Sequence, residues 1–322
     1  MTPRHLALGA AVVLANLHCQ GDCGQWESAE QLDLGVADDL HAITWYAPDP
    51  PYRTLAVGAG GVIVDRSDDD LEIAHPVTAD LHAVLITPTF AIAVGDRGTV
   101  VRTGHLDNSP WTTVAAGTTA DLHALVAVGD DLFVAGDAAV LHHDAASDTW
   151  TELSPPNGGW GPLRMAVHTA AGTVVAGLGG LAWTTPTPDD LLTPWTRLSL
   201  ATDADLLAGE SDVIVGRRGA VRVRLGADWI SVDAPVDADF VAVARIPELY
   251  NPGPETHTLL AADGRVFDLD PAERTLTEST TLAPDLRALV STRSEYSARV
   301  LGVGPAGAAE LREYRGCEPW LE

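Results

Sequence analysis

Aspartate and histidine recur in this chain at a spacing that could build a shared site. Asp39, Asp80 and Asp121 lie 41 residues apart, and a histidine follows each two positions later, as His41, His82 and His123. Carboxylates and imidazoles are ligand types that hold metal ions or cationic groups. If the copies fold around one axis, the pattern predicts a ring of these side chains.

Fainter copies carry the pattern further. Aspartate returns at Asp205, Asp239 and Asp285, and arginine takes the histidine position at Arg164 and Arg287. The candidate ligand-binding residues are therefore Asp39, Asp80, Asp121, His41, His82, His123, Arg164 and Arg287. A structural interpretation stays open, because an aspartate before a strand commonly accepts backbone N–H groups of the entering turn. The histidines also share a strand face with apolar residues, which favours packing between repeats.

Other charged groups are weaker candidates. Arg217 and Arg218, with Arg222 and Arg224, form a local basic patch that could receive an anionic partner or pair with neighbouring acids. The pair His142-His143 lacks a third ligand at a suitable spacing. The acidic turn Asp65–Asp70 has Asp70 where a calcium loop requires glycine. The chain has no nucleophile or phosphate-loop motif, so we predict no catalytic residue, metal or cofactor.

The sequence predicts that short strands position these residues. In the second copy, apolar Ala91–Val94 is followed by the turn Gly95–Gly98 and by apolar Thr99–Val101. β-Branched runs separated by glycine turns predict hairpins. A fourth, more polar strand begins with tryptophan in four copies, at Trp111, Trp150, Trp195 and Trp229. Seven units of four strands, with a period near 40, predict an all-β, seven-bladed β-propeller of antiparallel sheets.

The seventh unit lacks its own outer strand, and the amino end supplies a candidate. Residues Trp26–Ala29 match the fourth strand, so we expect the amino-terminal strand to pair in the last blade and close the ring. Cys23 and Cys317 would flank this junction, and a disulfide between them would replace the turn that joins the strands elsewhere. The alternative is two unpaired thiols near the ends of the chain.

The amino terminus has the character of an export signal. Leu6–Leu17 is apolar and uncharged, too short to span a bilayer but suited to a signal peptide. Cys19 raises a second possibility, lipidation. We expect residues 1–18 to be a signal peptide or lipoprotein signal, 19–25 a linker and 26–322 one propeller domain. The expected location is secreted, periplasmic or on the outer surface.

The repeat itself resembles a known family. Leu81-His82-Ala83-Val84, followed by Ala93-Val94-Gly95-Asp96-Arg97-Gly98-Thr99-Val100, is similar to the YCF48-like and BNR-like propeller repeats. The same pattern runs from Trp111 through Leu122–Leu125 to Val134–Gly136. The resemblance covers residues 26–314 and implies a propeller fold. Of the sialidase-type Asp box, only Asp148-Thr149-Trp150 stands in a similar place, so no sialidase chemistry is implied.

The composition limits the classes of partner that we expect. The formal net charge is −26, and the 19 basic residues are all arginine. Such an acidic chain argues against nucleic acid or anionic membrane as the main partner. We expect a monomeric, non-catalytic module that binds or scaffolds a protein or glycan. The alternative is a glycoside hydrolase- or lyase-type enzyme with acids at the channel mouth.

Overall fold

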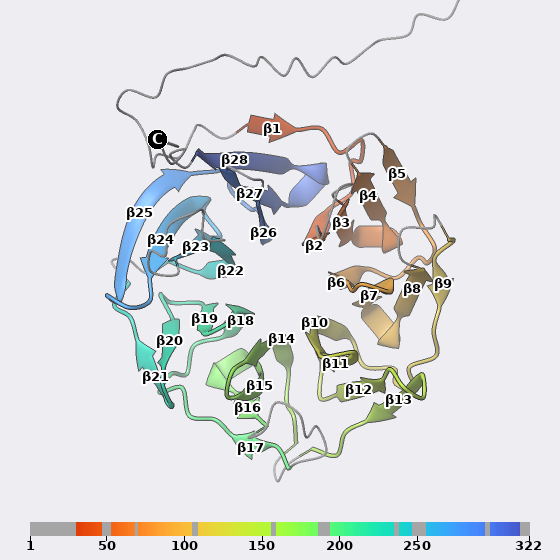
Figure 1. Cartoon of the computed structure of the whole chain (residues 1–322), viewed down its shortest axis with the longest axis horizontal. Coiled ribbons are helices and arrows are strands. Elements are labelled where there is room, and N and C mark those ends of the chain that lie inside the picture. Colours follow the sequence, from red (N-terminus) through yellow and green to blue (C-terminus); the bar gives the residue numbers. More distant parts are fainter. Residues whose placement is uncertain are drawn as a thin grey trace, which may run out of the picture.

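The described part of the chain is a ring of small sheets. The computed structural model describes residues 30–46, 53–67, 70–104, 109–155, 159–185, 194–234, 238–246, 256–293 and 297–315. Within these ranges, seven four-stranded antiparallel sheets stand around a common axis (Figure 1). The predicted seven-bladed propeller is confirmed. The described ranges contain no helix long and apolar enough to cross a membrane.

Each blade is formed by consecutive strands, except the last. Blade 1 comprises β2 (Leu40–Tyr46), β3 (Arg53–Gly58), β4 (Ile63–Ser67) and β5 (Leu71–Ala74); blade 2 comprises β6 (Leu81–Ile86), β7 (Phe90–Gly95), β8 (Val100–Gly104) and β9 (Thr112–Thr113). Blade 3 comprises β10 (Leu122–Val128), β11 (Asp131–Gly136), β12 (Val140–Asp144) and β13 (Thr149–Glu152); blade 4 comprises β14 (Leu163–Thr169), β15 (Gly172–Gly177), β16 (Ala182–Thr184) and β17 (Thr196–Arg197). Blade 5 comprises β18 (Leu206–Glu210), β19 (Val213–Gly216), β20 (Val221–Leu225) and β21 (Asp228–Ser231); blade 6 comprises β22 (Phe240–Ile246), β23 (Thr256–Ala261), β24 (Arg265–Asp270) and β25 (Thr275–Thr281).

The last blade takes its outer strand from the amino-terminal side. Its sheet order is β1 (Glu30–Leu32), β28 (Ala309–Arg315), β27 (Ser297–Val303) and β26 (Ala288–Arg293). Strand β1 pairs antiparallel with β28, with Glu30 opposite Leu311 (Figure 1). The stretch Trp26–Ala29, expected to form this strand, lies outside the described residues. Cys19, Cys23 and Cys317 lie outside them as well.

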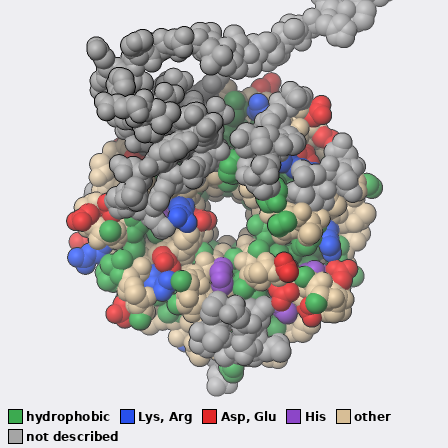
Figure 2. Space-filling view, viewed as in Figure 1, with side chains coloured by type: hydrophobic (Ala, Val, Ile, Leu, Met, Phe, Trp, Pro, Cys, Tyr) green, Lys and Arg blue, Asp and Glu red, His purple; other side chains and the backbone are tan. Residues whose placement is uncertain are grey.

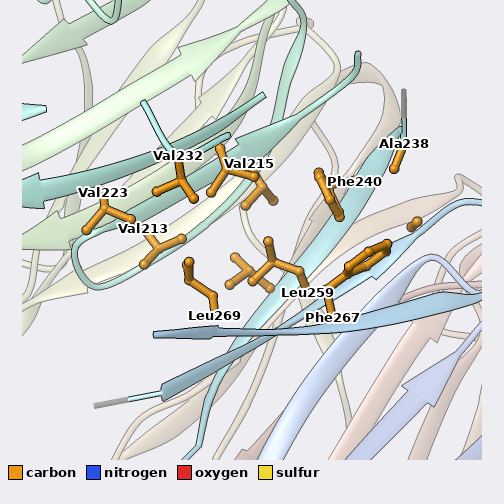
Figure 3. Packing of buried hydrophobic residues seen from close by; sticks show 12 residues of the cluster. Val213, Val215, Val223, Val232, Ala238, Phe240, Leu259, Phe267 and Leu269 are labelled. Atoms are coloured by element: carbon orange, nitrogen blue, oxygen red, sulfur yellow. The ribbon is translucent and has the colours of Figure 1, made fainter. Parts of the chain in front are cut away.

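The hydrophobic core is divided among the blade interfaces. Seven clusters of buried side chains each join neighbouring blades. Between blades 5 and 6, Val213, Val215 and Val223 face Leu259 and Phe267 (Figure 3). One of the seven clusters joins blade 7 to blade 1. Every blade therefore buries its apolar faces against two neighbours and depends on both.

Position within the blade sets how polar a strand is. The second strands, such as β7 and β15, are buried along their whole length because both of their faces are covered. The outer strands β5 and β9 are mostly exposed. The expected tryptophans adjoin the outer strands but do not begin them. Trp150 and Trp229 are second in β13 and β21, and Trp111 and Trp195 precede β9 and β17.

The first strand of each blade is the innermost one and faces the axis (Figure 1). An opening remains at the centre of the ring in the space-filling view (Figure 2). Between the second and third strands, four blades have a single 3-10 turn: η1 (Ala59–Gly61), η2 (Asp96–Gly98), η3 (Leu178–Gly180) and η4 (Pro305–Gly307). We call the end of the ring that carries these turns and the starts of the inner strands the turn face.

Two glycines frame each such turn for different reasons. At Gly58 an added Cβ would lie 1.9 Å from the main-chain oxygen of Asp39, so the close approach of β3 to β2 excludes a side chain. At Gly61 the φ is 75°, and an added Cβ would lie 2.2 Å from the oxygen of Val77, in the segment that leads from β5 into the next blade. The repeated glycine pair thus serves one contact within a blade and one between blades.

Substitution of Gly58 should therefore cost much more than substitution of Gly60. In Gly58→Ala the inner strand must shift, and we expect a loss of about 3 kcal/mol or more in the free energy of unfolding. Gly60 has φ 61° but no atom within 4 Å of an added Cβ. Gly60→Ala should cost about 1 kcal/mol. Urea unfolding of both variants measures the difference, and equal losses would contradict this account of the turn.

Candidate functional site

Five inner-strand aspartates join neighbouring blades on the turn face. Each carboxylate accepts a backbone N–H from the turn of the preceding blade, an interaction we call the aspartate bridge. The pairs are Asp39 with Ala306 at 2.9 Å, Asp80 with Gly60 at 2.8 Å, Asp121 with Arg97 at 2.7 Å, Asp205 with Gly179 at 2.9 Å and Asp239 with Arg218 at 3.0 Å. The interpretation that these aspartates accept backbone N–H groups is right, but the donor lies in the neighbouring blade.

The same residues also hold the turn of their own blade. The main-chain oxygen of Asp80 accepts the N–H of Asp96 at 3.0 Å, and that of Asp121 accepts the N–H of Asp137 at 2.8 Å. Each aspartate thus fixes two turns at once. At Asp39, the hydrogen bond from the N–H of Ala306 is the main cause that lowers the pKa of the carboxyl group; burial opposes it, and the charge of Arg287 adds to the lowering.

The bridge is replaced at two places. Blade 4 starts with Pro162, and there the N–H of Ala138 bonds to the oxygen of Gly161 at 2.9 Å. Asp285 of blade 7 has φ 69°, and its own N–H bonds to the oxygen of Ala262 at 3.1 Å. The seven-fold sequence pattern therefore overstates the regularity of the contact.

Six of the inner strands have a β-bulge at their start, five of them directly after an aspartate and the sixth after Pro162. In β2, for example, the register shifts between Leu40 and Ala42, which leaves the residue between them unpaired. The unpaired residues of blades 1 to 6 are His41, His82, His123, Arg164, Leu207 and Val241. Bulges re-aim a side chain relative to the strand. Because leucine and valine occupy the same position, the fold does not require histidine there.

The three histidines contact one another across two blade boundaries, and we call them the histidine row. The ring centroids of His41 and His82 are 5.4 Å apart and nearly parallel, and those of His82 and His123 are 5.0 Å apart. His41 donates from Nδ1 to the oxygen of Leu81 at 3.0 Å, and His82 Nε2 lies 2.6 Å from Asp96 Oδ1. Burial is the main cause that lowers the pKa of His41 and that of His123.

Two arginine–aspartate pairs bound the histidine row. Arg164 donates from Nη1 to Asp137 Oδ1 at 2.5 Å, and Arg287 donates from Nη2 to Asp39 Oδ2 at 3.0 Å. Burial favours the protonated form of Asp137, but the hydrogen bond and charge of Arg164 outweigh it and lower the pKa. The structure thus brings the predicted arginines and histidines together on blades 7, 1, 2, 3 and 4. Among the residues that the structure describes, no three His, Cys, Asp or Glu side chains are grouped to hold a metal ion.

In the predicted arginine patch, Arg217, Arg218 and Arg224 are each paired with an aspartate. Arg217 lies 3.4 Å from Asp205, and Arg218 lies 2.7 Å from Asp203. Arg224 donates to Asp212 at 2.7 Å, as expected for an internal pair. Arg222 differs from that expectation, because it donates to the main-chain oxygens of Leu200 at 2.6 Å and Ala201 at 3.1 Å.

The remaining candidates form pairs. His142 Nε2 lies 3.0 Å from Asp131, and His143 Nε2 lies 2.9 Å from Asp148. The buried Arg53 donates hydrogen bonds from both Nε and Nη2 to the carboxylate of Asp65. Residues 68–69 of the acidic turn lie outside the described part of the chain.

A buried histidine at the opposite end of the ring carries no strong sequence signal. His257 is the second residue of strand β23 and is 1% exposed, and neither of its ring nitrogens has a hydrogen-bond partner among the described residues. Burial, followed by the charge of Arg245, lowers its pKa to about 4. Nearby, burial raises the pKa of Glu210. In the sequence, the only signal for this buried group is a histidine that precedes the apolar run Leu259–Ala261.

Solved structures with the same fold exist at low sequence identity. YCF48 from Cyanidioschyzon merolae matches with a TM-score of 0.66 and 13% identity, over 90% of this chain and 99% of that one. A structure described as YCF48 bound to D1 peptide matches with a TM-score of 0.63 and 14% identity, over 91% and 95%. The WD40 repeats of RRP9 match with a TM-score of 0.69 and 12% identity, over 91% and 99%. These likenesses show the fold.

Sequence comparison adds no family. No family model matches the chain, and no curated protein matches it. The function must therefore be argued from the geometry of the turn face.

Removal of one aspartate bridge should loosen a blade boundary. Asp121→Ala leaves the N–H of Arg97 without its acceptor, and we expect a loss of about 1–2 kcal/mol in the free energy of unfolding. Asp121→Asn keeps an acceptor oxygen and should lose less. Asp285→Asn is the matched control, since its carboxylate makes no bridge, and should change stability by less than about 0.5 kcal/mol. Urea titrations in which the two sites behave alike would count against the bridge.

Acid should destabilise the fold through His257. Its folded pKa of about 4 lies below the unfolded value of 6.5, so the neutral form is the one that the fold stabilises. The contribution of His257 to the free energy of unfolding is complete above pH 6.5. As the pH falls toward 4, this contribution decreases by up to about 3 kcal/mol. His257→Leu should remove this part of the pH dependence and hold its stability at pH 5. An unchanged slope of unfolding free energy between pH 6.5 and 4.5 in the variant would contradict the assignment.

Proposed function

We propose that this chain is a non-catalytic propeller that binds a protein partner through its turn face. The observation that carries the proposal is that the backbone of the turn face is fixed, whereas the side chains at the bulges can differ from blade to blade. Aspartate bridges hold the starts of the inner strands, and the bulge beside each bridge displays a side chain that folding does not dictate. Rigid scaffolds that display variable side chains on one face are well suited to recognition.

The structural neighbours support a protein partner. One of them is a YCF48 structure described as bound to a D1 peptide, so a propeller of this shape accepts a peptide. The tryptophans expected from the repeat adjoin outer strands and lie away from the inner strands of the turn face. This arrangement favours a protein over a glycan that would stack on aromatic rings.

The use of the acids supports a non-catalytic role. A glycosidase needs two carboxyl groups free to exchange protons or attack the substrate. Here Asp39, Asp80 and Asp121 each accept a backbone N–H across a blade boundary. We also propose that the protein is exported, on the strength of the apolar segment Leu6–Leu17, which lies outside the described residues.

Site-specific photocrosslinking tests the proposal. A photoreactive amino acid in place of Arg97, which is exposed on the turn face, should crosslink one protein in an extract of the native host. The same amino acid in place of Thr277, exposed on the outer strand β25, is the matched control and should give no such product. Equal products from both positions would contradict recognition by the turn face. Hydrolysis of labelled glycans by the purified chain would instead favour an enzyme.

A further inference from the structure

The negative charges near the histidine row are less well matched than the positive ones. On the turn face, Arg164, Arg217, Arg218 and Arg287 are each paired with an aspartate, and the exposed Arg97 supplies one further positive charge. Asp80 and Asp121, in contrast, have only backbone N–H donors in the described part of the chain. Among the described residues, the carboxylate of Asp96 is paired only with the imidazole of His82. Excess negative charge therefore surrounds the row, which favours a cationic ligand.

The histidine row supplies a neutral aromatic surface beside these carboxylates. Burial lowers the pKa of His41 and that of His123, so both rings are neutral at pH 7. At His123 the charge of Arg164 lowers the pKa further; at His41 the hydrogen bond to Leu81 opposes burial, and the charges of His82 and Arg287 act with burial. Adjacent imidazolium rings at 5.0 and 5.4 Å would repel each other. A planar guanidinium group stacks on neutral aromatic faces and pairs with carboxylates.

The site is open enough to admit a side chain. His82 is 23% exposed and Asp96 is 31% exposed, and the nearby Asp137 is 43% exposed. These groups lie at the channel mouth, where the inner strands β6 and β10 begin. The aspartate bridges fix the backbone beneath them, so binding requires little reorganisation of the protein.

We propose that the histidine row, with Asp80 and Asp96, is a binding site for a cationic side chain of a protein partner, arginine above all, and that protons compete with it. The site deepens the proposed function, on which it rests, by naming the chemistry of the partner. Protonation of the row would place positive charge where the guanidinium lies. The groups that face the row are Asp39, Asp80, Asp96, Asp137, Arg164 and Arg287.

The test uses a peptide and an uncharged analogue. Calorimetric titration of the full chain with acetyl-Gly-Arg-Arg-Gly-amide at pH 7.5 should give a dissociation constant about tenfold lower than with the citrulline analogue. At pH 5.5 the arginine peptide should bind about tenfold more weakly than at pH 7.5. Equal binding of the two peptides, or no effect of pH, overturns the inference.

Variants locate the site. Asp96→Asn should weaken arginine binding about fivefold at pH 7.5. Asp228→Asn, with the same charge change on the outer strand β21, is the control and should change it less than about twofold. The triple variant His41→Leu, His82→Leu and His123→Leu keeps a residue type found at the same bulge in blade 5. It should fold with a cooperative thermal transition and lose both the binding and its pH dependence. Retention of either one overturns the assignment to the row.

The experiments distinguish a failure of the cationic site from a failure of the proposed function. If the host protein still crosslinks at position 97 but arginine and citrulline peptides bind alike, the cationic site is wrong and the scaffold proposal stands. If the arginine peptide binds as described but no host protein crosslinks at position 97, the site stands and the proposed function fails.

Discussion

The aspartate bridge is the interaction on which the turn face depends. A carboxylate at the start of one inner strand accepts the N–H of a residue in the turn of the preceding blade, and its main chain holds the turn of its own blade. The contact is polar, directional and local, whereas the apolar packing between blades is extensive but non-directional. Packing of branched side chains allows small slides between sheets, and the bridges at five of the seven blade boundaries oppose them. The register of adjacent blades is thereby fixed where the channel opens.

This frame separates residues that build the ring from residues that are displayed on it. Asp121 and Gly136 belong to the first group, because one bridges the blades and the other leaves room for the Asp121 main chain. His82 and Leu207 belong to the second group, since they occupy equivalent bulges with different chemistry. The distinction explains why a repeat can be regular in its aspartates and glycines while its bulge positions vary. Only the side chains at the variable positions can change to suit a partner without disturbing the ring.

Much of the fold could be predicted because its determinants are local and repeated. The Gly95–Gly98 turn and the apolar strands beside it specify a blade, and the 41-residue period specifies a ring. The prediction of the site was less complete. The histidines and arginines that meet on the turn face were found, but their stacking depends on an unpaired residue in each bulge, which strand alternation does not reveal. The donors of the bridges lie in the neighbouring blade, and the environment of His257 is formed by two blades. Such contacts depend on the angle between sheets, which the sequence pattern does not encode.

Native-state amide hydrogen exchange tests the central claim most directly. The N–H groups of Gly60, Arg97, Gly179, Arg218 and Ala306 lie in surface turns and would exchange rapidly without an acceptor. If the aspartate bridges hold the blades together, these five amides exchange at least about a hundredfold more slowly than those at the hairpin tips of Gly129 and Gly226. Exchange of the five at the same rate as the hairpin tips would show that the aspartate bridges do not hold the blades together.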